Sequence, residues 1–421
     1  MDSSSLVLVA GVFLAYAVLS RRLEGTPLTA AIVFVGAGFV FSSEGLGWLH
    51  VSLGQESVRV LAEATLTVVL FTDASRIDLR ALRQEYGLPA RLLGIGLPLT
   101  IVAGTIAAGL VLPGIKWAEA AVLAIALAPT DAALGQAVVT DEALPSRIRQ
   151  ALNVESGLND GLCVPLLAIA LAFAETESGG MSAAHATRLA AEAIGWGLVG
   201  GIVAGAVAAY AVRLTRRRGW IEERWLEVVP LAAAAGAYAI ATANGGSGFI
   251  AAFVGGALYG RIVGREADAA ALSEELGGVL SGVTFIVFGA AVLGALWSQI
   301  TFVEVVYAVL SLTVIRMVPV AIAMLGSAAR APTVLFVGWF GPRGLASIVF
   351  GIVIVEASGL PHTSTLVVTL TVTIALSVVA HGLTAAPLAR RYAAWHQAVA
   401  SPMESAPAHP QRWRHRSSRP R

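Results

Sequence analysis

Residues 155–161 read ESGLNDG, and the interpretation of the whole chain starts from this stretch. It places two carboxylates and a carboxamide within residues 147–174, which otherwise have the composition of a buried membrane helix. A carboxylate at the centre of a bilayer is costly, so it normally faces a cavity and carries a function. Upstream, residues 126–132 read ALAPTDA, an apolar helix interrupted by a proline beside an acid. Two such interruptions in consecutive spans indicate an ion or proton pathway and therefore a transporter.

The composition is that of a polytopic membrane protein. Hydrophobic residues make up 57% of the 421 positions and charged residues 13%, whereas a soluble domain carries about 25% charged residues. The mean hydropathy is +0.77. The single cysteine, Cys163, excludes a disulfide framework and a cysteine metal site. Because it lies within an apolar span, we expect it to pack as a small hydrophobic side chain.

Thirteen stretches are long and apolar enough to cross a bilayer as helices, which takes about 20 residues each. We therefore expect an all-α polytopic membrane protein, with residues 1–397 forming its transmembrane domain. The span 247–263 is short and rich in glycine, and it is expected to be a buried helix packed through small residues. The expected spans are residues 4–20, 27–44, 57–74, 90–112, 117–139, 147–174, 187–214, 225–243, 247–263, 274–298, 301–327, 332–356 and 363–389.

The basic residues predict the orientation of these spans. Loops after odd-numbered spans, together with the C-terminal tail, carry 23 of the 28 Lys and Arg residues. Loops after even-numbered spans carry only Arg59, Lys116 and Arg188. The positive-inside rule then places the N-terminus outside and the C-terminus in the cytoplasm, with the chain in the plasma (inner) membrane. Residues 398–421 are polar and rich in Pro, Ser and Arg, and we expect a disordered basic cytoplasmic tail.

A second interrupted helix occurs seven spans after the first. Residues 338–344 read GWFGPRG and interrupt the span 332–356, as Pro129 interrupts the span 117–139. Their span numbers, 5 and 12, differ by an odd number, so the two run in opposite directions through the membrane. Two helices broken by Gly and Pro in corresponding halves indicate an inverted repeat, with the binding site at the breaks.

Helical spacing sorts the polar residues of the first motif. At about 100° per residue, Ser156 and Asp160 share one face of a helix, and Glu155 and Asn159 share a neighbouring face. A carboxylate with a hydroxyl and backbone carbonyls nearby suits a hard cation such as Na⁺, which prefers oxygen ligands. These residue types therefore predict a cation site on this helix.

The proline break is expected to supply further oxygens. Pro129 has no N–H, so carbonyls near Thr130 are expected to be free to turn toward a bound ion. Asp131 then lies at the broken end, where its charge can compensate an exposed helix N-terminus.

Three further ionisable residues lie in or at the ends of spans. A buried arginine needs a partner, and we expect Arg343 to pair with Glu155 in a largely structural role. Arg316, in the span 301–327, is a second candidate counter-charge to a carboxylate. Asp73 closes the span 57–74 and is either a ligand at a cavity mouth or a solvated helix end.

Taken together, residues 129–131, 155–161 and 341–344 resemble the signature of sodium/proton antiporters. They are most similar to the prokaryotic NhaP-like branch of the cation:proton antiporter family, which also contains the sodium/hydrogen exchangers. The resemblance covers roughly residues 4–390, with the three motifs in the expected order and spacing. It implies thirteen helices, a six-helix core domain with two crossed broken helices, and a dimerisation domain.

The resemblance also implies a role for each polar residue at the breaks. It assigns Glu155 and Arg343 to an ion pair and Asp131 to the helix-end charge. The residues that it implies for the site of Na⁺ and the proton are Asp160, Ser156 and Thr130, with Asp73 at the matching acidic position.

These implications describe an electroneutral Na⁺/H⁺ antiporter. One cation and one proton would compete for a single buried aspartate, Asp160, during alternating access. Related electrogenic antiporters carry a second aspartate at the position of Asn159, so the neutral Asn159 implies one proton per cation. Na⁺ and H⁺ are the expected substrates, the lipid bilayer and a second copy of the chain are the expected partners, and neither a cofactor nor nucleic acid is expected.

Three alternatives remain open at this stage. The same exchanger could carry K⁺ or Li⁺, because a flexible oxygen site does not declare its size preference. An intramembrane aspartyl protease could use Asp131 and Asp160, although the Gly-Xaa-Gly-Asp signature is absent. A channel would show flux that scales with voltage. We expect a secondary active transporter and not an enzyme.

Overall fold

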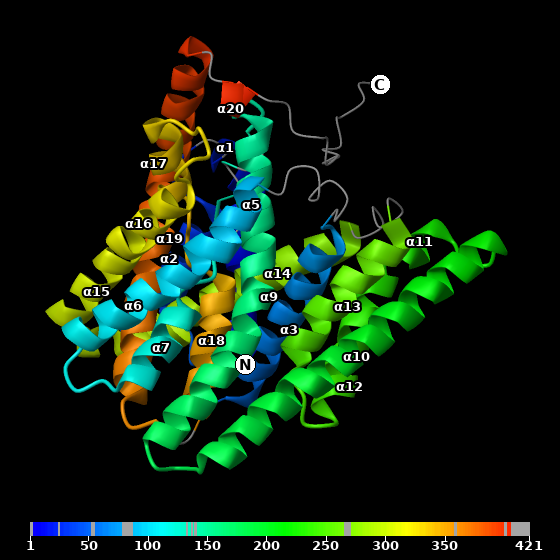
Figure 1. The fold of residues 1–421 in the computed structure, drawn as a ribbon, viewed down its shortest axis with the longest axis horizontal. Helices are drawn as coiled ribbons and strands as arrows, with labels where there is room; N and C mark the ends of the chain where they lie inside the picture. The colour runs from blue at the N-terminus through cyan, green and yellow to red at the C-terminus, as the bar shows by residue number, and fades with distance from the viewer. Residues whose placement is uncertain are drawn as a thin grey trace.

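The computed structural model describes residues 3–23, 26–51, 55–77, 87–131, 134–135, 138, 141–264, 271–357, 360–399 and 402–405. Within these residues all regular secondary structure is helical, and each of the thirteen predicted spans contains a helix (Figure 1). The helices are α1 (Ser3–Leu23), α2 (Ala30–Phe41), α3 (Glu56–Ser75), α5 (Gly87–Arg91), η1 (Leu92–Gly96), α6 (Leu97–Val111), α7 (Trp117–Ala126), α9 (Ser146–Glu177), α10 (Ala183–Arg217), α11 (Glu223–Leu226), α12 (Val229–Thr242), α13 (Gly248–Val263), α14 (Ala271–Val287), η3 (Phe288–Gly294), η4 (Trp297–Gln299), α15 (Phe302–Leu312), α16 (Val314–Ala323), α17 (Ala331–Trp339), α18 (Leu345–Glu356), α19 (Thr363–Ala398) and α20 (Pro402–Ser405).

The helix lengths fit a polytopic membrane protein. Among the described residues, eight helical segments are long and apolar enough to cross a membrane, and α2, α7, α13 and α18 are shorter apolar helices. Cys163 is fully buried in the main apolar core, as predicted.

Two spans are broken at the predicted places. The helix of span 117–139 stops at Ala126, before Pro129, and residues 340–344 separate α17 from α18 in the span 332–356. Span 90–112 and span 274–298 also contain π-helical turns, η1 and η3, which the sequence analysis did not predict. Neither π-helical segment contains a proline, so composition gave no signal for them.

Many of the helices belong to one of two groups. In one group α3, α10, α12 and α13 pack against one another, and in the other α6, α7, α9 and α15 to α19 do so. Figure 1 shows α10, α12 and α13 on one side of α3 and α9, with α15, α16 and α17 on the other. The second group comprises spans 4, 5, 6, 11, 12 and 13, which matches the expected six-helix core.

Small residues bring α13 into backbone contact with its neighbours. A Cβ atom on Gly205 of α10 would lie 2.4 Å from the carbonyl oxygen of Gly255. A Cβ atom on Gly256 would lie 2.2 Å from the carbonyl oxygen of Phe71 on α3. Only glycine allows such approaches, so the predicted close packing of the span 247–263 is confirmed.

Two polar contacts agree with alternating spans. Arg91, at the start of span 90–112, donates through Nη1 to the carbonyl of Leu325, at the end of span 301–327, at 2.6 Å. Lys116 and Glu177 follow even-numbered spans, and Lys116 Nζ donates to the Glu177 carbonyl at 3.1 Å. We call the end that contains Arg91 the arginine-rich end.

Part of the predicted disordered tail is folded. Glu404 on α20 is 1% exposed, and its Oε1 accepts hydrogen bonds from Thr333 Oγ1 at 2.6 Å and from the Arg330 N–H at 3.2 Å. The carboxylate thus caps the amino end of α17, where N–H groups lack helical partners. Met403 packs into the apolar cluster that contains Phe336. The prediction of disorder is wrong for residues 402–405, and residues 400–401 and 406–421 lie outside the described residues.

The docking of α20 predicts a loss of stability in the variant Glu404→Ala. Removing the buried carboxylate leaves the Thr333 hydroxyl and the Arg330 N–H without this acceptor, at a cost of about 1–3 kcal/mol. We expect a lower melting temperature in detergent than for the wild type. Glu192→Ala removes only an exposed pair with Arg188 and is the matched control, expected to melt with the wild type. Identical melting temperatures for the two variants would contradict the docking.

Candidate functional site

The break in span 117–139 leaves carbonyls that side chains satisfy. The Ala128 N–H still reaches the Ile125 carbonyl at 3.2 Å, so the helix closes with one tight turn. The carbonyls beyond this turn were expected to be free for an ion, but they accept hydrogen bonds from other elements. The donors are Ser347 Oγ to Ala126 (2.8 Å), Arg343 Nη1 to Ala128 (2.6 Å) and to Pro129 (3.3 Å), and Ser156 Oγ to Thr130. The Thr130 carbonyl is therefore held in place, with a second lone pair still available.

The two breaks cross and bond to each other directly. The Asp131 N–H donates to the Pro342 carbonyl at 2.7 Å. Asp131 Oδ2 accepts the Leu345 N–H at 2.9 Å, so this carboxylate caps the amino end of α18. A Cβ atom on Gly344 would lie 2.0 Å from Asp131 Oδ2, and glycine is therefore required for the approach. Asp131 does lie at a helix N-terminus, but that helix belongs to the other break.

A buried ion pair joins α9 to α16. Arg316 Nη1 lies 2.6 Å from Glu155 Oε1, Arg316 Nη2 lies 2.9 Å from Glu155 Oε2, and both side chains are 2% exposed. This bidentate geometry pairs both carboxylate oxygens with guanidinium donors. The predicted pairing of Glu155 with Arg343 is wrong, because Arg316, the second candidate counter-charge, occupies both oxygens.

Arg343 instead donates hydrogen bonds to backbone carbonyls at the break in span 117–139. Its Nη1 bonds the carbonyls of Ala128 and Pro129, and its backbone N–H donates to Ser377 Oγ on α19 at 2.7 Å. A guanidinium is a donor only, so it suits a place where several carbonyls have lost their helical partners. Its positive charge also lies at the carboxyl end of α7, where a helix dipole favours a cation.

Asp160 lies beside a cluster of neutral oxygens. Asn159 Nδ2 donates to Thr130 Oγ1 at 2.7 Å, and Ser156, one turn before Asp160, donates to the Thr130 carbonyl. Asp160 is 9% exposed, and its Oδ1 is buried with no hydrogen-bond partner among the described residues. A buried carboxylate oxygen without a donor is costly, so this atom is a natural position for a cation or a proton.

Asp73 faces the same turn of α9 from the end of α3. A Cβ atom on Gly157 would lie 3.8 Å from the Asp73 Cβ, so the two helices touch here. Asp73 is half-buried beside this turn of α9, so it is not a fully solvated helix end. The contact distance also shows that a methyl group would fit at Gly157.

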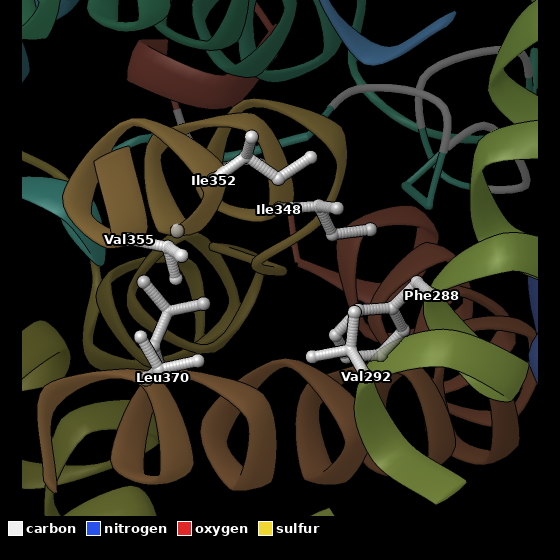
Figure 2. A pocket seen from close by; sticks show the side chains of 8 residues that line it. Phe288, Val292, Ile348, Ile352, Val355 and Leu370 are labelled. Atoms are coloured by element: carbon white, nitrogen blue, oxygen red, sulfur yellow. The ribbon is translucent and has the colours of Figure 1, made fainter. Parts of the chain in front are cut away.

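A separate apolar pocket lies between α18, α19 and η3 (Figure 2). Figure 2 shows aliphatic side chains and one aromatic ring facing this space, which offers no ligand to a cation. The lining residues are Phe288, Val292, Ile348, Gly351, Ile352, Val355, Val367 and Leu370. None of the polar residues of the candidate site is among them. Within the described ranges, no group of three or more His, Cys, Asp or Glu side chains is arranged to hold a metal ion.

The sequence analysis overlooked Ser347 and Ser377, which each bond one of the breaks. Serine and threonine inside apolar helices commonly bond the carbonyl four residues earlier, as Thr369 and Thr373 do on α19. Residue type alone therefore carried no signal. The helical spacing of polar residues along one face of α19 was the signal that could have found Ser377.

A family model described as sodium/hydrogen exchanger, transmembrane, matches residues 9–391. The chain belongs to the sodium/hydrogen exchanger family. Membership makes it a membrane transporter and not an enzyme, as predicted.

Individual relatives are more distant. The K(+)/H(+) antiporter NhaP of Alkalimonas amylolytica is 23% identical over 396 residues, which cover 91% of this chain and 66% of that protein. The chain thus spans slightly less than two thirds of the length of this relative. Two structures of the sodium proton antiporter MjNhaP1 from Methanocaldococcus jannaschii are 16% identical and superpose with TM-scores of 0.69 and 0.70. They cover 90% and 93% of this chain and 98% of their own, and they share its fold.

The bidentate pair of Glu155 with Arg316 predicts which charge-swapped double variant recovers stability. Glu155→Ala or Arg316→Ala strands a buried charge, at a cost of about 3–5 kcal/mol, and should yield little folded protein in detergent. The swapped double variant Glu155→Arg/Arg316→Glu should recover part of the melting temperature. The matched swap Glu155→Arg/Arg343→Glu should not. Recovery by the second swap alone would show that Arg343 is the partner after all.

Proposed function

We propose that the chain is a secondary antiporter that exchanges Na⁺ for H⁺, one for one, at Asp160. The observation that carries this proposal is the buried Asp160 Oδ1, which has no hydrogen-bond partner among the described residues. The neutral oxygens of Ser156 and Thr130 are joined by a hydrogen bond, and Thr130 also bonds Asn159, the residue before Asp160. One carboxylate and neutral oxygens suit a monovalent cation, whereas a divalent ion would favour several carboxylates.

Coupling follows from competition at this carboxylate. A proton on Asp160 cancels the charge that holds Na⁺, and a bound Na⁺ occupies the oxygen that would take the proton. Asp160 avoids a bare buried charge only when it carries a proton or Na⁺, so only these two states change readily between the inward-open and outward-open conformations. Ser156 and Thr130 complete the oxygen set, and Asp73 receives the cation at the entrance.

The remaining polar residues fix the positions of the helices and ligands around Asp160. Asn159 orients the Thr130 hydroxyl, and Glu155 with Arg316 ties α9 to α16. We propose that α6, α7, α9 and α15 to α19 move as one body against α3, α10, α12 and α13 during alternating access. The latter group would form the contacts between two copies in a homodimer. Residues 1–397 make up the transmembrane unit in this proposal.

We assign the arginine-rich end to the cytoplasm, in the plasma membrane, with the N-terminus outside. Exposure around the site supports access from that end. Asp160 is 9% exposed, whereas Asp73 and Gly157, which lie nearer the arginine-rich end, are half-buried.

K⁺ is the second candidate substrate. The relative from Alkalimonas amylolytica is named as a K(+)/H(+) antiporter, and one carboxylate with neutral oxygens can bind either ion. Li⁺ is a third possibility on the same chemical ground.

Asp160→Asn should abolish exchange, because it removes the charge for which the cation and the proton compete. The measurement is the pH change induced by Na⁺, K⁺ or Li⁺ in everted vesicles that lack other antiporters. Asp141→Asn is the matched control, since Asp141 lies outside the site and its carboxylate accepts the exposed Ala143 N–H at 2.9 Å. We expect the control to exchange like the wild type and Na⁺ to give the largest wild-type signal. Wild-type exchange in Asp160→Asn would refute the mechanism, and a larger response to K⁺ would identify the second candidate.

The neutral Asn159 predicts that exchange moves no net charge. With one titrating carboxylate, each cycle carries one Na⁺ against one H⁺. Clamping the membrane potential at zero should therefore leave the rate of Na⁺-driven exchange unchanged, at limiting and saturating Na⁺. A steady-state current on a solid-supported membrane that reverses with the Na⁺ gradient would show that more than one proton moves per cation.

A further inference from the structure

Three polar side chains on one face of α19 hold the break between α17 and α18. Ser377, His381 and Thr384 follow one another at helical spacing. Ser377 Oγ accepts the Arg343 N–H at 2.7 Å, His381 Nε2 lies 2.9 Å from the Trp339 carbonyl oxygen, and the Trp339 indole N–H donates to Thr384 Oγ1 at 2.9 Å. Each of the three side chains therefore bonds either the last residue of α17 or the non-helical segment after it.

His381 occupies the middle of this stripe and is 1% exposed. Its ring stacks on that of Trp339, with 5.1 Å between the centroids, and its Nδ1 lies 3.1 Å from Ser377 Oγ. Both ring nitrogens face a backbone carbonyl oxygen, because Nδ1 also lies 2.9 Å from the Ser377 carbonyl oxygen. With the hydrogen on Nε2, the ring donates to the Trp339 carbonyl, and Nδ1 can accept the Ser377 hydroxyl, whose oxygen accepts the Arg343 N–H.

The same hydrogen bonds continue from Arg343 to the candidate site. The Arg343 guanidinium holds the carbonyls of Ala128 and Pro129. The next residue, Thr130, bonds Asn159 and Ser156, which precede Asp160 on α9. Hydrogen bonds, joined through Arg343 itself and through the peptide bond from Pro129 to Thr130, thus link His381 to the residues beside the unpartnered carboxylate oxygen.

We propose that His381 is a positioning residue for the cation site. It fixes the segment between Trp339 and Arg343, and through Arg343 it sets where the Thr130 oxygens lie relative to Asp160. His381 does not touch the cation, and it neither binds nor releases the transported proton. This inference rests on the proposed function, because it concerns the geometry of the proposed Asp160 site.

A purely structural role predicts a different result. If His381 only anchors the end of α17, its loss lowers the melting temperature and the amount of active protein, while the surviving molecules bind the cation normally. If it positions Thr130, its loss raises the KM for the cation in molecules that are folded. The ratio of the change in KM to the change in Vmax separates the two roles.

The test compares His381→Leu with His381→Gln in everted vesicles, using the cation that gives the largest wild-type signal. Leucine removes both hydrogen bonds, whereas the glutamine amide can donate to the Trp339 carbonyl and accept from Ser377. We expect His381→Leu to raise the KM by about five- to tenfold, the scale of one lost hydrogen bond, and His381→Gln to recover most of it. Thr384→Val is the matched control, because it removes the bonds to the Trp339 indole and to the Ala380 carbonyl, neither of which leads to Arg343, and it should leave the KM unchanged.

Ser377→Ala keeps the inference testable if His381→Leu folds poorly. It deletes the middle of the hydrogen-bonded series with a small change of volume, and it should raise the KM in the same way. The inference would be overturned if folded Ser377→Ala and His381→Gln both had a wild-type KM and His381→Leu showed either a wild-type KM or a loss of stability alone. An equal rise in Thr384→Val would also overturn it. Absence of exchange in the wild type with every cation would instead defeat the proposed function.

Discussion

The exchange of hydrogen bonds between the two broken spans is the constraint on which the rest of the structure depends. Inside a bilayer, water cannot satisfy the backbone groups of an interrupted helix, so the protein must do so. Each break provides a side chain that bonds the unpaired backbone groups of the other. The Arg343 guanidinium takes the carbonyls at the carboxyl end of α7, and the Asp131 carboxylate takes an N–H at the amino end of α18. Both charges also have the sign that the adjacent helix dipole favours.

This crossing explains how a single carboxylate is left available. Ser156 and Asn159 are engaged with Thr130, Glu155 is neutralised by Arg316, and Asp131 caps α18. Asp160 alone among the acids on this part of α9 keeps a buried oxygen without a partner in the described structure. The surrounding polar groups thus fix the backbone, and the Asp160 carboxylate is left as the group on which we propose that exchange takes place.

The sequence predicted the features that depend on residue type and helical periodicity, namely the spans and their breaks. It did not predict which side chains pair with each other, because that depends on how distant helices pack. Apolar length and proline placed the thirteen spans and both breaks, because these signals are local. The partner of Glu155 was wrong, since Arg316 and Arg343 are equally plausible until the packing of α16 against α9 is known. Residues 402–405 have a polar composition, and their order comes from the uncapped start of α17, which the tail sequence does not reveal.

The central claim is that the cation and the proton compete for Asp160. Na⁺/Na⁺ counterflow at equal pH on both sides of the membrane tests it most directly, because no proton gradient then drives the flux. The account predicts that lowering the pH raises the KM for Na⁺ in proportion to the proton concentration, while the Vmax at saturating Na⁺ stays constant. A Vmax that falls with pH at constant KM would place the proton at a different group and contradict the account.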